Sequence, residues 1–129
     1  MNNSTVKKCG IYLYDFGPYI GSKQGGLRPA ITLTESTKNP TVIIAPLTKS
    51  HKKSSMAAHV FLGKRFNLHE SSQVLLEQLQ TVNKASLGPY IGHVDDEQIL
   101  KAIDHGLCKT FGIHSFPVYT GASEQEDCL

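Results

Sequence analysis

The order of the predicted elements constrains this chain most, because every segment of strand character precedes the one convincing helix. Alternating or continuous apolar runs, rich in β-branched and aromatic residues, predict strands at 11–16, 30–34, 41–45 and 59–62, and strand character within 73–82. Strands that alternate with helices would indicate a parallel sheet, whereas strands followed by one helix indicate an antiparallel sheet with helical cover. We therefore expect an α+β, mainly β domain with a strongly curved antiparallel sheet. The third strand should end near Pro46, which has no N–H to donate to a sheet.

The helix is predicted between Asp95 and Gly112. Asp95 can cap its first turn, and Gln98 three residues later completes a pattern typical of helix starts. Gly112 is a typical C-terminal stop, whereas Gly106 inside the helix costs about 1 kcal/mol relative to alanine. Apolar residues at helical spacing predict the buried face: Ile99, Leu100, Ile103, Leu107 and Phe111.

Length and charge indicate one soluble domain. The chain has 129 residues and a formal net charge of +2, so it is long enough for a core and only mildly basic. No signal-peptide core and no membrane-spanning run is visible, so we expect a cytoplasmic protein. The three cysteines form no Cys-x-x-Cys pair, and we predict no metal site. We place a flexible N-terminal arm at residues 1–8, the domain at 9–113 and a polar tail at 114–129.

The connection between the first two predicted strands contains the sequence GSKQGGLRP at residues 21–29. It is longer than the two to five residues that a hairpin loop usually needs, and long polar loops on rigid scaffolds often carry function. It lacks the Gly-Lys-Ser/Thr ending and the following helix of a phosphate-binding P-loop. The loop alone favours a structural role for Arg28, in which it is a surface arginine that stacks on a tyrosine or pairs with Asp15.

These segments, taken together, resemble the MazF (PemK/Kid) family of toxin endoribonucleases. The resemblance covers roughly residues 9–113, with few gaps and in the same order. It is carried by 10–18, 21–29, 40–48, 59–60, 74–82 and the helix at 95–112.

The resemblance implies a small SH3-like β-barrel that forms a homodimer and cuts single-stranded RNA at short sequence motifs. The family needs no metal or cofactor for this cleavage, which leaves a 2′,3′-cyclic phosphate and a 5′-hydroxyl. Its catalytic arginine falls on Arg28 and its catalytic threonine on Thr48. A cognate antitoxin of the MazE type would block the RNA groove.

Chemistry assigns these two residues different tasks. A guanidinium can grip two phosphate oxygens, so Arg28 suits stabilisation of the pentavalent phosphorus, but its high pKa makes it a poor general base. Thr48 can orient the phosphate, although a strand-end hydroxyl also often bonds backbone. Where the family usually has a glutamate, this chain has Lys23, which removes one candidate base. The identity of the base stays open, with His59 a weak candidate.

Further residues are predicted to contact RNA. The loop and the basic cluster after Thr48 would bind phosphate and bases, although such clusters are usually solvated surface. Tyr19 or Phe16 can stack a base, although core packing is the safer interpretation. The predicted RNA-binding residues are Ser22, Lys23, Gln24, Gly25, Lys49, Lys53, Glu77 and Gln78.

A second hypothesis keeps the same barrel fold, but the protein acts by binding and cleaves no RNA. A toxin resembling the CcdB proteins, which poison DNA gyrase, would need neither Arg28 nor Thr48. The presence of both residues in register favours the nuclease.

Overall fold

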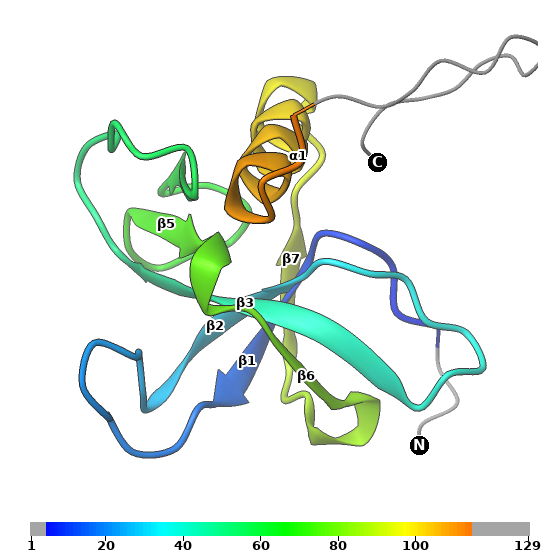
Figure 1. The fold of residues 1–129 in the computed structure, drawn as a ribbon. Coiled ribbons are helices and arrows are strands. Elements are labelled where there is room, and N and C mark those ends of the chain that lie inside the picture. The colour runs from blue at the N-terminus through cyan, green and yellow to red at the C-terminus, as the bar shows by residue number, and fades with distance from the viewer. Residues whose placement is uncertain (1–4, 115–129) are drawn as a thin grey trace, which may run out of the picture.

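The computed structural model describes residues 5–114. Within them the chain forms a curved sheet of seven strands with one α-helix against it (Figure 1). In chain order the elements are β1 (Gly10–Asp15), β2 (Leu27–Thr32), β3 (Thr41–Lys49), β4 (His59–Gly63), β5 (Ser72–Leu75), η1 (Leu76–Gln78), β6 (Gln80–Asn83), η2 (Lys84–Ser86), β7 (Tyr90–His93) and α1 (Glu97–Thr110).

Strand β3 is the centre of the sheet, and its two halves have different neighbours. The strands run in the order β4-β5-β3-β2-β1-β7, all antiparallel, and β6 pairs with β3 outside this path. Residues 41–44 of β3 pair with β6, whereas its residues 47–49 pair with β5. Because β4 and β7 end the order without pairing to each other, the sheet is an open half-barrel. The predicted mainly β fold with a C-terminal helix is confirmed.

The core has two parts, one on each face of the sheet. Residues of β3 contribute to both parts. Ala45 and Leu47 belong to the cluster beneath α1, whereas Val42 and Ile44 belong to the cluster on the opposite face. Helix α1 packs on β4 and η1, and the loop between β1 and β2 projects at the opposite end of the molecule (Figure 1). The helix therefore closes one side of the sheet and leaves the loop side open.

The helix differs from the prediction at both ends. Its N-cap is Asp96 rather than Asp95, and the Asp96 carboxylate accepts the Ile99 N–H at 3.1 Å. Phe111 follows the last helical residue and is 61% exposed, so it is not part of the buried face. The other predicted apolar residues do contact the core.

Gly106 has a packing role that the sequence pattern did not reveal. A Cβ atom there would lie 2.5 Å from the Ala57 carbonyl oxygen and 2.6 Å from Leu76 Cδ1. The helix can approach η1 and the segment before β4 this closely only because residue 106 has no side chain.

Three strand predictions need correction, and one strand was missed. Strand β2 begins at Leu27, so Arg28 lies in a strand rather than in the loop. Strand β3 continues through Pro46. On one side of β3 the neighbouring strand changes from β6 to β5 at this point, and a proline is tolerated at such a break in the pairing. The run at 73–82 is divided by η1, and β7 was not predicted.

The described part of the predicted N-terminal arm is attached to the domain. Val6 is buried and exchanges two backbone hydrogen bonds with Ser36, so the chain is held against the domain at this residue. The tail predicted at 114–129 lies outside the described residues except for His114. No helix in the described part of the chain is long and apolar enough to cross a membrane.

Candidate active site

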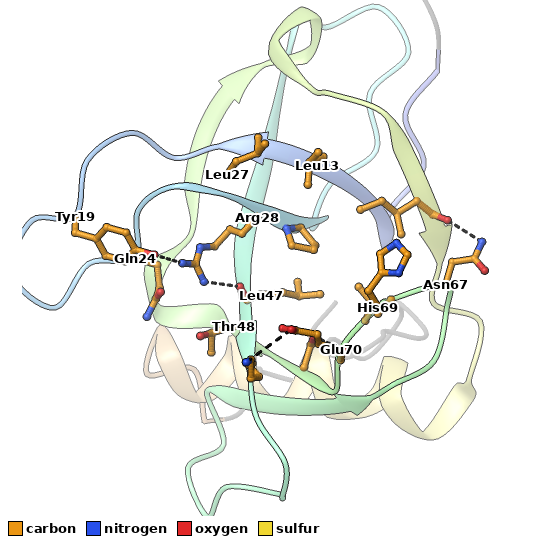
Figure 2. Close-up of a pocket in the computed structure, with 15 residues that line it drawn as sticks. Leu13, Tyr19, Gln24, Leu27, Arg28, Leu47, Thr48, Asn67, His69 and Glu70 are labelled. Carbon is orange, nitrogen blue, oxygen red and sulfur yellow. Dashed lines mark hydrogen bonds and ion pairs between the residues drawn. The ribbon is translucent and has the colours of Figure 1, made fainter.

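A groove of about 610 Å³ opens between β2, β3 and the segment that joins β4 to β5 (Figure 2). Its apolar lining is formed by Leu13, Leu27, Pro29, Leu47, Leu68 and Ile91. Its charged and polar side chains include Gln24, Arg28, Thr48, Lys49, His69 and Glu70. The groove therefore combines apolar surface with two cations, one carboxylate and one imidazole.

Arg28 is held in the groove by neutral acceptors. It is half-buried on β2, where its Nε donates to the Gly25 carbonyl at 2.9 Å and its Nη1 to the Leu47 carbonyl at 3.2 Å. Its Nη2 donates to the Tyr19 hydroxyl, and the guanidinium carbon lies 5.7 Å from the centre of that ring. Among the described residues, no carboxylate lies within 4.0 Å of Arg28. Its orientation is thus fixed while its charge is left uncompensated.

The sequence left two structural roles open for Arg28, an ion pair with Asp15 and stacking on a tyrosine, and the structure contains only the second. The Asp15 carboxylate accepts the Gly17 N–H at 2.9 Å and does not pair with Arg28. The contact with a tyrosine does occur, but Tyr19 is 65% exposed and lines the same groove. The stacked tyrosine is therefore part of the groove and not a separate surface contact.

The glycine-rich loop is built around close backbone approaches. Gly25 is buried, and a Cβ atom there would lie 2.6 Å from the Tyr19 nitrogen and 2.7 Å from the Gly17 carbonyl oxygen. Gln78 then ties the loop to η1, since it accepts from the Gln24 N–H at 2.8 Å and donates to the Ser22 carbonyl at 3.2 Å. These contacts place Tyr19 and the Gly25 carbonyl where Arg28 can bond both.

Thr48 and Lys49 reach the groove from the end of β3. Thr48 is half-buried and lies opposite Gln73 of β5, and Lys49 lies opposite Ser72. The bond from Arg28 to the Leu47 carbonyl brings the guanidinium to the residue that precedes Thr48. Figure 2 shows Arg28 and Thr48 on the same side of the groove. The two residues that the family resemblance singled out are therefore neighbours in space.

The other predicted RNA-binding residues divide into three groups. Gln24 and Lys49 line the groove, while Ser22, Gly25 and Gln78 shape the loop beside it. Within the described chain, Lys23, Lys53 and Glu77 do not line it, and Glu77 instead pairs with His59 at 3.0 Å. That pairing leaves the weak base candidate His59 outside the groove. The roles predicted for these residues stay predictions.

The segment between β4 and β5 supplies groove residues that the sequence reasoning missed. Asn67, His69 and Glu70 all line the groove. Asn67 donates to the Ile91 carbonyl at 3.0 Å, and Glu70 lies 3.7 Å from Lys49. No local motif marks these residues, because they reach the groove only through the pairing of β5 with the end of β3.

The groove can bind an anion without help from a further group. Arg28 and Lys49 give it two cations, and Gln24 and Thr48 add neutral hydrogen-bonding groups. Among the described residues, no group of three His, Cys, Asp or Glu side chains could hold a metal ion. The arrangement suits an anion such as a phosphate diester, with apolar surface beside it.

Known proteins share both the sequence and the shape of this domain. The profile of the family described as "PemK-like, MazF-like toxin of type II toxin-antitoxin system" matches residues 7–111. Endoribonuclease EndoA of Bacillus subtilis is 37% identical over 106 residues, which cover 79% of this chain and 90% of that protein.

Solved structures agree on the fold. MazF from Deinococcus radiodurans superposes with a TM-score of 0.67 at 20% identity, over 84% of this chain and 98% of that one. A mycobacterial endoribonuclease in complex with its cognate antitoxin gives 0.66 at 20% identity, over 87% and 99%. From the sequence match over almost the whole described domain, we conclude that the chain belongs to the PemK-like, MazF-like toxins of type II toxin–antitoxin systems.

Proposed function

We propose that this toxin is an endoribonuclease that cleaves single-stranded mRNA at short sequence motifs, without a metal, and so inhibits translation in the cytoplasm. The observation that carries the proposal is the oriented, uncompensated Arg28 beside Thr48 in an open groove. The similarity to EndoA supports the same activity. The products would be a 2′,3′-cyclic phosphate and a 5′-hydroxyl.

In this reaction the ribose 2′-oxygen attacks the adjacent phosphorus and the 5′-oxygen leaves. Charge builds on the phosphoryl oxygens, and fixed donors aimed at that charge usually give the largest rate gain. Arg28 supplies such a donor set because its guanidinium is held in place by Gly25, Leu47 and Tyr19. Thr48 orients the phosphate through its hydroxyl.

Substrate binding would combine general and specific contacts. Lys49, with Lys53 nearby in sequence, attracts the phosphate backbone in a salt-dependent manner. Gln24 and the backbone of Ser22, Lys23 and Gly25 bind bases and phosphates along the loop, with Glu77 and Gln78 at its edge. Tyr19, at 65% exposure, offers a ring on which a base can stack.

Two macromolecular partners belong to the proposal. A second copy of the chain would form a homodimer, and a MazE-like antitoxin would cover the groove. The complex of a mycobacterial relative with its cognate antitoxin supports the second partner. The gyrase-binding alternative is not favoured, because the matched relatives are MazF-type toxins and endoribonucleases.

The direct test incubates the purified toxin with a long single-stranded RNA in the presence of EDTA. We expect discrete cuts, and we expect Arg28→Ala to abolish them while the circular dichroism spectrum is unchanged. Lys101→Ala, which removes one positive charge from an exposed position of α1, is the matched control and should cut normally. Absence of cutting by the unaltered toxin, or its abolition by EDTA, would contradict the proposal.

A further inference from the structure

The glycine-rich loop contains no carboxylate, because position 23 is a lysine, and Arg28 follows the loop in β2. Two side chains that line the groove carry atoms that can act as a base, the Glu70 carboxylate and the His69 imidazole. We propose that Glu70 is the general base that removes the proton of the ribose 2′-hydroxyl. This assignment rests on the proposed ribonuclease function and names a catalytic residue for it.

The backbone places Glu70 beside the reacting end of β3. Ser72 lies opposite Lys49 in the β3–β5 pairing, and Glu70 precedes Ser72 by two residues. The buried Ser72 hydroxyl donates to the Glu70 carbonyl at 2.8 Å, and the Ser50 N–H donates to the Ser71 carbonyl at 2.9 Å. The turn that carries Glu70 is therefore fixed to the same strand that carries Thr48.

Lys49 directs the Glu70 side chain without immobilising it. The Lys49 Nζ lies 3.7 Å from Glu70 Oε2, which is longer than a hydrogen bond, and both side chains are about 60% exposed. An exposed pair of this kind contributes little to stability. The carboxylate can therefore leave Lys49 and reach a hydroxyl on bound RNA, while the ammonium faces the phosphate backbone.

The position of His69 makes it the weaker candidate. Figure 2 shows His69 on the side of the groove toward Asn67, whereas the Glu70 side chain points toward Thr48. The scissile phosphate should lie near Arg28 and Thr48, so the 2′-hydroxyl next to it is closer to Glu70. The Arg28 guanidinium carries only N–H donors and has no lone pair to offer as a base.

The proposed step is balanced in protons and electrons. The Glu70 carboxylate takes the 2′-hydroxyl proton as the 2′-oxygen forms its bond to phosphorus. The bond from phosphorus to the 5′-oxygen then breaks, and that oxygen takes a proton from water to become a hydroxyl. The Glu70 carboxylic acid returns its proton to water, which restores the enzyme.

The test compares single-turnover cleavage of a short RNA that spans a mapped cut site. Glu70→Gln keeps the shape but removes the base, and we expect the rate to fall at least 100-fold, within the usual range for a lost general base. Affinity for the same RNA with a 2′-deoxyribose at the cut should stay within about threefold, since the base is not needed for binding. Glu35→Gln, the same change at an exposed position outside the groove, should cut at the normal rate.

Two further measurements separate a base from a positioning residue. Formate should restore cleavage by Glu70→Ala in a concentration-dependent manner, but should not restore it to Arg28→Ala. A Glu70→Gln rate within tenfold of normal, or a loss in Glu70→Ala that formate does not rescue, overturns the assignment. A 100-fold loss in His69→Gln with Glu70→Gln unaffected gives the role to the imidazole instead. If the unaltered toxin cuts no RNA at all, the proposed function fails together with this inference.

Discussion

The two arginines of this chain lie in regions with opposite electrostatics. Arg65, next to the start of α1, pairs with the Asp96 carboxylate at 3.0 Å and covers the Phe66 ring at 4.7 Å. Arg28, in the groove, bonds only neutral oxygens among the described residues. Asp96 also caps α1, so Arg65 belongs to a closed structural unit. The same side chain thus stabilises the fold in one region and presents free charge in the other.

The two environments differ in how much of the arginine's charge remains available to a ligand. A guanidinium already paired to a carboxylate has little attraction left for phosphate, because the partner cancels its charge. Neutral carbonyl and hydroxyl acceptors fix the orientation of Arg28 and leave its charge available. We therefore expect changes in the groove to alter cleavage more than stability, and changes on the helix side to do the reverse.

The largest effect is expected from Arg28→Lys. Lysine keeps the charge but cannot present the planar fork that bonds Gly25, Leu47 and Tyr19 together with a phosphate. We expect the cleavage rate to fall about 100- to 1,000-fold, as for other lost transition-state donors. Arg65→Lys is the matched control, and its rate should change less than threefold. Equal losses in the two variants would remove the distinction between the regions.

Gly106→Ala should show the opposite pattern. The added Cβ would lie 2.5 Å from the Ala57 carbonyl oxygen, so the helix must shift. Overpacking of this kind costs about 1–3 kcal/mol, partly offset by the better helix propensity of alanine. We expect a lower free energy of unfolding in urea and unchanged cleavage at 25 °C. Ala102→Gly, at an exposed position of α1, calibrates the propensity contribution, and a more stable Gly106→Ala protein would refute the close packing.

Tyr19→Phe should have a moderate effect confined to the groove. The change removes the hydroxyl that accepts from Arg28 Nη2 and keeps the ring that lies 5.7 Å from the guanidinium. Loss of one hydrogen bond to a charged group costs about 1.5 kcal/mol, so we expect roughly a tenfold slower cleavage with similar RNA affinity. Tyr14→Phe, in β1 and outside the groove lining, is the control. An unchanged rate in Tyr19→Phe would mean that the Tyr19 hydroxyl does not position Arg28.

The smallest effect should be an acid dependence on the helix side. The Ile99 N–H and then the Arg65 guanidinium lower the pKa of Asp96 from its ordinary value of 3.8. A lowered pKa stabilises the fold at pH values above the ordinary one, and this contribution is lost as the pH falls through the folded-state value. At pH 6 we expect Asp96→Asn to melt a few degrees below the unaltered protein, with the gap closing below pH 4. A gap that stays constant down to pH 2 would show that the charge of Asp96 does not matter.

Local patterns were enough to predict the fold class and most strands. Alternation marked β1 and β2, short apolar runs marked β3 and β4, and the spacing of Ile99, Leu100, Ile103 and Leu107 marked α1. The errors lie where tertiary contacts decide the outcome. Pro46 is accepted within β3 because the neighbouring strand changes there, and Asp96 is preferred as the cap because Arg65 supports it.

The site was predictable only in part. Arg28 and Thr48 were found through the family resemblance, and their closeness in the groove agrees with it. The neutral acceptors around Arg28 and the position of Glu70 near Lys49 depend on pairings between segments that are distant in the sequence. No local motif encodes these pairings. Gln78 shows the same limit, since its role in tying the loop to η1 appears only in three dimensions.

Removal of one oxygen atom from the substrate tests the proposed attack by the ribose 2′-oxygen. A single 2′-deoxyribose at a mapped cut site removes the nucleophile and leaves the phosphate, the bases and the groove contacts in place. With EDTA present, we predict that the toxin binds this RNA normally and leaves that site uncut, while the all-ribose RNA is cut to a 2′,3′-cyclic phosphate and a 5′-hydroxyl. Cleavage at the deoxy-substituted site would contradict attack by the 2′-oxygen, and with it the chemistry assigned to the groove.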